Sequence, residues 1–79
     1  MRLALLPTGE AVRPDEVRRI RIEPERSVLE QEVRSYAVVI DLADQPPWTL
    51  KGGLALDDAI SLSRRCGQAV NEGLASPKE

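Results

Sequence analysis

Few side chains in this sequence could carry out catalysis or bind a metal ion. The 79 residues include no histidine and a single cysteine, so the commonest proton shuttle and the commonest metal ligand are both absent. Cys66 follows two arginines that could activate a thiol. It also lies beside the apolar stripe of a predicted helix, and nothing near it supplies a base. We therefore interpret Cys66 as a structural thiol.

Four aspartates are the only acidic residues grouped closely enough to suggest a cation site: Asp41, Asp44, Asp57 and Asp58. Their spacing lacks the alternating oxygen ligands and the glycine of a calcium-binding loop. We interpret Asp44 as a turn residue, and the last two as the start of a helix, where acidic side chains complement the positive end of the helix dipole. The sequence thus predicts no metal, no cofactor and no catalytic residue, and a protein that is not an enzyme.

The arginines between positions 18 and 26 form the one notable basic cluster. On one face of a strand, Arg19 and Arg21 either form an ordinary solvated face or contact phosphates or the carboxylates of a partner protein. The neighbouring glutamates would cancel much of their field, and a formal net charge of −2 gives no general reason to expect nucleic acid. Nucleic-acid binding is therefore the alternative hypothesis, and it would use Arg18, Arg19, Arg21 and Arg26.

These side chains must be positioned by a small α+β fold. The isoleucines and arginines of residues 17–22 alternate as in a half-buried strand, and residues 36–42 predict the central strand. Residues 56–74 have the period of one amphipathic helix. We predict a single domain over residues 1–75, in which a small antiparallel sheet of three to four strands packs against one C-terminal helix. Residues 76–79 are predicted to be a disordered tail.

Proline and glycine set the predicted limits of these elements. Pro24 is predicted to lie in a connection after the strand at 17–22, and the glycine pair at 52–53 to end a strand at 48–51. Gly67 is expected to let the helix approach the sheet closely, and Gly73 to end the helix. The helical stripe predicted to face the sheet consists of Leu56, Ala59, Ile60, Ser63, Gly67, Val70 and Leu74.

The strand at 36–42 has apolar residues on both of its faces. The residues predicted to point toward the helix are Tyr36, Val38, Ile40 and Leu42. Ala37 and Val39 point the other way, where a protein with one helix has nothing to cover them. They are either ordinary apolar surface or the dry centre of an intermolecular interface, rimmed by Arg19, Arg21, Asp41 and Thr49. Both interpretations stay open.

The turn before the last strand is stiffened by Pro46 and Pro47, which reduces the entropy lost when a partner binds there. Trp48 follows the turn directly. It is either an anchor residue of an interface or the main filler of a core that contains no phenylalanine.

These observations favour a non-enzymatic protein-binding module, such as a small adaptor, inhibitor or accessory subunit of a bacterium, phage or mobile element. The expected partner is another protein, or a second copy in a homodimer. A lone cysteine fits a reducing cytoplasm, and no run approaches the roughly 18 apolar residues of a membrane span. The module is predicted to act through the outer face of the sheet or through the turn at Trp48, and the predicted contact residues are Arg19, Arg21, Ala37, Val39, Pro47 and Trp48.

Overall fold

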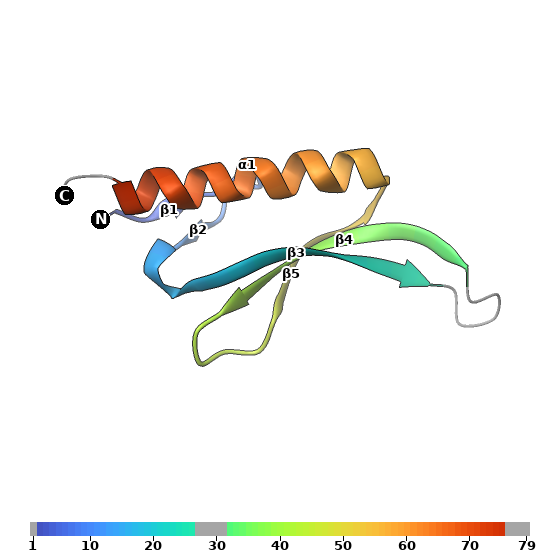
Figure 1. Cartoon of the computed structure of the whole chain (residues 1–79), viewed down its shortest axis with the longest axis horizontal. Coiled ribbons are helices and arrows are strands. Elements are labelled where there is room, and N and C mark those ends of the chain that lie inside the picture. Colours follow the sequence, from blue (N-terminus) through green and yellow to red (C-terminus); the bar gives the residue numbers. More distant parts are fainter. Residues whose placement is uncertain (1, 27–31, 76–79) are drawn as a thin grey trace.

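The computed structural model describes residues 2–26 and 32–75, and within them the chain has an α+β fold (Figure 1). Two short strands, β1 (Ala4–Leu5) and β2 (Ala11–Val12), form an antiparallel pair. A turn of 3-10 helix, η1 (Pro14–Glu16), leads into an antiparallel sheet with the strand order β3-β4-β5. Its elements, with the helix that follows, are β3 (Val17–Arg26), β4 (Val33–Leu42), β5 (Trp48–Leu54) and α1 (Leu56–Ala75). The predicted fold class is confirmed, whereas the predicted tail at 76–79 lies outside the described residues.

The helix and the longer sheet form two layers that run along the same direction (Figure 1). α1 packs on β3 and β4, and its C-terminal half also contacts β1 and η1. The molecule measures 49 × 26 × 16 Å. Because β4 lies between β3 and β5, the strand predicted to be central does occupy the middle of the sheet.

The core lies between α1 and the near face of this sheet. Val38 and Ile40 of β4 are completely buried there, in one cluster with residues of β1, β2 and α1. Tyr36 and Leu42 pack against the same cluster, so the predicted orientation of β4 is confirmed. Cys66 of α1 is also completely buried, and this burial raises the pKa of its thiol. A neutral thiol within an aliphatic core serves packing.

The buried stripe of α1 differs from the predicted one. Leu56 and Leu74, which were expected to face the sheet, are 44% and 49% exposed. The physical reason is that β1 and η1 pack on one flank of α1 and turn its buried face toward the N-terminal segment. The residues of α1 that are buried are Ala59, Leu62, Cys66, Val70 and Gly73.

Neither of the two helical glycines has the role that the sequence predicted. A Cβ atom at Gly67 would meet no atom within 4 Å, so this glycine does not bring α1 close to the sheet. At Gly73 a Cβ would lie 3.0 Å from the carbonyl oxygen of Arg2 and 3.0 Å from Cγ of Pro14. Gly73 therefore allows the N-terminal segment to approach α1, and it lies within the helix instead of ending it.

The predicted limits of two strands were also wrong. β3 runs through Pro24 to Arg26, which an edge strand permits because one side of it has no partner for the missing N–H. β5 continues through both glycines to Leu54. The pairing of β4 with β5 shifts register in this region, and Gly53 has a φ of 68° that glycine adopts without strain.

Candidate functional site

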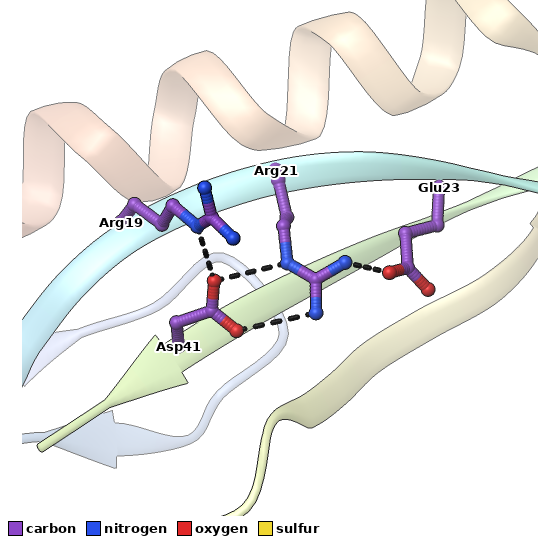
Figure 2. A network of polar contacts seen from close by, with 4 residues as sticks. All are labelled: Arg19, Arg21, Glu23 and Asp41. Atoms are coloured by element: carbon purple, nitrogen blue, oxygen red, sulfur yellow. Dashed lines mark hydrogen bonds and ion pairs between the residues drawn. The ribbon is translucent and has the colours of Figure 1, made fainter.

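A chain of charged side chains crosses the face of the sheet that is turned away from α1 (Figure 2). Asp41 of β4 receives hydrogen bonds from two arginines of β3. Arg19 donates from Nε to Oδ2 at 2.5 Å, and Arg21 donates from Nε to Oδ2 at 2.9 Å and from Nη2 to Oδ1 at 3.2 Å. Arg21 also forms an ion pair with Glu23. Two arginines and two carboxylates thus neutralise one another.

The electrostatics of Asp41 follow from this geometry. The hydrogen bonds from Arg21, and then from Arg19, lower the pKa of the Asp41 carboxyl. Arg21 presents two nitrogen atoms to both carboxylate oxygens, the planar pairing for which a guanidinium is suited. Its side chain is 27% exposed, whereas that of Arg19 is 70% exposed. Arg19 is therefore the member of this network that a binding partner could reach most easily.

On the same face of the sheet, the side chain of Glu25 connects all three strands. Its Oε1 atom accepts a hydrogen bond of 2.8 Å from the hydroxyl of Ser35 on β4 and one of 2.7 Å from the backbone N–H of Gly53 on β5. The Gly53 bond, and then the Ser35 bond, lower the pKa of the Glu25 carboxyl. Glu25 therefore reaches from β3 across β4 to β5.

These charged side chains cover the apolar residues at the centre of the face. Ala37 and Val39 are absent from the core cluster beneath α1, yet they are only 5% and 2% exposed. In the strand register Ala37 lies opposite Glu23, and Val39 lies opposite Arg21. The expectation that nothing covers them was wrong, because long side chains on β3 shield the smaller ones on β4. Whether a partner binds over this face stays a prediction.

A second feature is an apolar groove beside the turn between β4 and β5. It has a volume of about 530 Å³. Trp48 is half-buried: it packs against the core and also lines this groove, so it takes part in both. Arg13 at the rim forms ion pairs with Asp15 at 3.5 Å and with Glu16 at 3.7 Å. The lining residues are Ala11, Val12, Arg13, Glu16, Leu42, Gln45, Pro46, Pro47 and Trp48.

Only part of this groove was predicted. Pro47 and Trp48 were expected to form a contact surface, and the fold places both in the groove wall. Ala11, Val12 and Arg13 were missed because they come from β2 and the residue after it, more than thirty residues earlier in the chain. No local pattern in the sequence indicates that β2 and the turn before β5 lie side by side.

The four arginines of the nucleic-acid hypothesis are not brought into one patch. Arg19 and Arg21 are held by Asp41, while Arg18 and Arg26 are exposed and make no ion pair with any described residue. Eight residues of strand separate Arg18 from Arg26, which is about 26 Å at 3.3 Å per residue. The acidic residues are not gathered into a cation site either. Within residues 2–26 and 32–75, no group of three or more acidic or cysteine side chains could hold a metal ion.

Comparison of the chain with protein-family models, with curated proteins and with solved structures found no match. Among the described residues, no helix is both long enough and apolar enough to cross a membrane.

Proposed function

We propose that this chain is a non-enzymatic protein-binding module that contacts a partner protein through the groove beside Trp48. The observation that carries the proposal is the groove itself, about 530 Å³ of space between β2 and the turn before β5. A half-exposed tryptophan in such a concave site has the character of an interface anchor. The chain lacks histidine, and its one thiol is buried, which also supports binding over catalysis.

The lining indicates the chemistry of the bound segment. Val12, Leu42 and Trp48 make the floor and wall apolar, and the charged residues at the rim, Arg13 and Glu16, already pair with each other. The groove therefore suits an uncharged apolar side chain of the partner. Burying one leucine or phenylalanine there would contribute about 1.5–3 kcal/mol. The prolines of the turn lose little conformational freedom on binding.

The outer face of the sheet would supply a polar part of the contact. Arg19 is well exposed and bonds to Asp41 through one of its nitrogen atoms, so its remaining donors are available to a partner's carboxylate. Ala37 and Val39 would lie beneath the charged network. In this proposal the protein acts in the cytoplasm as a small adaptor, inhibitor or accessory subunit.

The test is capture of the partner from the source cells by the wild-type chain and by matched variants. Pro47→Glu and Gln45→Arg place a charge in the groove wall and are expected to abolish capture. Gln68→Arg is the matched control, because Gln68 is exposed on α1 and lines neither the groove nor the outer face of the sheet. With the purified partner, Trp48 emission should shift to the blue, and it is the only tryptophan of the chain. If Pro47→Glu and Gln45→Arg capture the same partner undiminished, the groove is not the binding site.

Nucleic-acid binding remains the alternative, and it is favoured by the exposed guanidinium groups of Arg18 and Arg26, which form no ion pair within residues 2–26 and 32–75. Binding led by phosphate contacts would weaken steeply as the salt concentration rises from about 50 to 200 mM, whereas an apolar contact would change little. Titration with a single-stranded and a double-stranded oligonucleotide at the two salt concentrations separates the two functions.

A further inference from the structure

A second groove runs along the other long side of the molecule, between α1 and the free edge of β3. Its volume is about 430 Å³. It stays open partly because Gly67 has no side chain, and a Cβ there would touch nothing. The lining combines apolar and small residues with three arginines: Val17, Arg18, Arg19 and Ile20 from β3, and Ser63, Arg64, Gly67, Val70, Asn71 and Leu74 from α1. Nothing in the described chain fills this space.

The strand beside the groove is an unpaired edge. Among the described strands β3 pairs only with β4, so the backbone groups on its other side are available to another strand. The register of β3 is interrupted at Arg18, between Val17 and Arg19. At the other end Pro24 has no N–H to donate. Residues 19–23 between these points form a regular edge with Arg21 at its centre.

The stripe of α1 above this edge has residues of similar size at equal distances on either side of position 65. An antiparallel copy of the helix would place Leu56 opposite Leu74, Ile60 opposite Val70, and Ser63 opposite Gly67. Large side chains would meet at both ends, where the two leucines are 44% and 49% exposed in the single chain. The smallest residues would meet at the centre, where two helices approach most closely.

We propose that a second copy of this chain occupies the groove, related to the first by a two-fold axis. The two β3 strands pair antiparallel into a six-stranded sheet, and the two α1 helices lie side by side above it. The two-fold axis would lie half a strand spacing outside β3. Because α1 packs on both β3 and β4, its axis lies above the midpoint between these strands, about one strand spacing from the two-fold axis. With strands about 4.8 Å apart, the two helices would be separated by about 9.6 Å. Packed helices lie 8–10 Å apart.

The side chains of β3 complement one another in this register. With Arg21 on the axis, Ile20 faces Ile22 of the partner copy on the helix side, and Arg19 faces Glu23 of the partner copy on the outer side. Because of the two-fold symmetry, each of these contacts occurs twice in the dimer. The two copies of Arg21 come close to each other, but each is already neutralised by Asp41 and Glu23 of its own chain. In this register the side chains of β3 therefore fit those of a second copy in both charge and apolar character.

The size of the contact sets the expected affinity. α1 has 20 residues, so it is about 30 Å long, and the contact also includes the edge of the sheet below it. Such a face buries roughly 600 Å² on each copy, or about 1,200 Å² in all, at the lower end of specific interfaces. A dimer that forms at micromolar concentrations is expected. This inference does not rest on the groove beside Trp48.

Sedimentation equilibrium between about 5 and 200 µM tests the proposal directly. The wild-type chain should approach twice its mass of 8.7 kDa. Gly67→Glu should stay a monomer at every concentration, and it should fold, because the single chain has room at this position. Gln68→Glu is the matched control, with the same charge on the adjacent exposed residue, and should dimerise. A wild-type mass of 8.7 kDa at 200 µM, or a dimer unaffected by Gly67→Glu, overturns the proposal.

A charge exchange tests the strand register. In a dimer of the Arg19→Glu variant, the new carboxylate at position 19 would face Glu23 of the partner copy. In a dimer of the Glu23→Arg variant, the new guanidinium at position 23 would face Arg19 of the partner copy. Each variant alone brings like charges together and should therefore be monomeric. Mixed in equal amounts, the two variants restore both opposite-charge pairs, and native mass spectrometry should detect the mixed dimer. If the mixture stays monomeric, the pairing of β3 centred on Arg21 is wrong. Pro47→Glu should leave the dimer intact, which keeps this test separate from that of the partner groove.

Discussion

Replacing each helical glycine with alanine should change stability in opposite directions. Gly67 and Gly73 both lie within α1, and neither conformation requires a positive φ. A methyl group at Gly67 would extend into open space, whereas at Gly73 it would press on the backbone of Arg2 and the ring of buried Pro14. The same chemical change therefore separates helix propensity from packing.

The magnitudes follow from these surroundings. Gly67→Ala should stabilise the fold by about 1 kcal/mol, the propensity difference in a helix interior. For Gly73→Ala the propensity gain is smaller, because Ala75 ends the helix two residues later. Relieving the two contacts at 3.0 Å should cost about 1–3 kcal/mol, so the net effect is a destabilisation of about 1 kcal/mol. In a domain of this size each kcal/mol moves the melting temperature by about 4–8 °C.

Thermal unfolding followed by circular dichroism measures both variants, and repeating it at two protein concentrations separates the contribution of self-association from that of the fold. We expect Gly67→Ala to melt about 10 °C above Gly73→Ala, with the wild type between them. An equal rise for both variants would refute the reasoning, because it would mean that the N-terminal segment does not pack against α1 at Gly73.

Three further changes test the core and the outer face. Cys66→Ser should lower the free energy of unfolding in urea by about 1–3 kcal/mol, because a more polar hydroxyl replaces the thiol at a completely buried position, and the native thiol should resist a disulfide reagent. Ile40→Ala should cost about 2–5 kcal/mol by opening a cavity, whereas Leu5→Ala, at an exposed position, should change stability by less than about 0.5 kcal/mol. The pKa of Asp41 is lowered in the fold from its ordinary value of 3.8, chiefly by Arg21, so its contribution to stability is complete above that value and is lost as the pH falls through the lowered pKa. Asp41→Asn should therefore flatten the acid limb of a stability curve measured by urea unfolding, and an unchanged limb would show that the network contributes nothing.

The sequence alone determined the features that depend on local periodicity. The alternation in residues 36–42 identified the central strand and the face that it turns to the helix, because successive strand side chains point to opposite sides. The helical period gave the extent of α1 to within one residue. The absence of histidine and the lone cysteine restricted the chemistry before any fold was known.

Only the tertiary structure decided what covers each surface. The helical stripe was misplaced because Pro14 and Arg2, far away in the sequence, pack against Gly73. Ala37 and Val39 are covered because strand register places Glu23 and Arg21 opposite them, and register depends on pairing between distant segments. The groove beside Trp48 likewise joins β2 to a turn that follows β4. Periodicity reports the direction of a side chain along its own element, whereas burial depends on which other elements pack there.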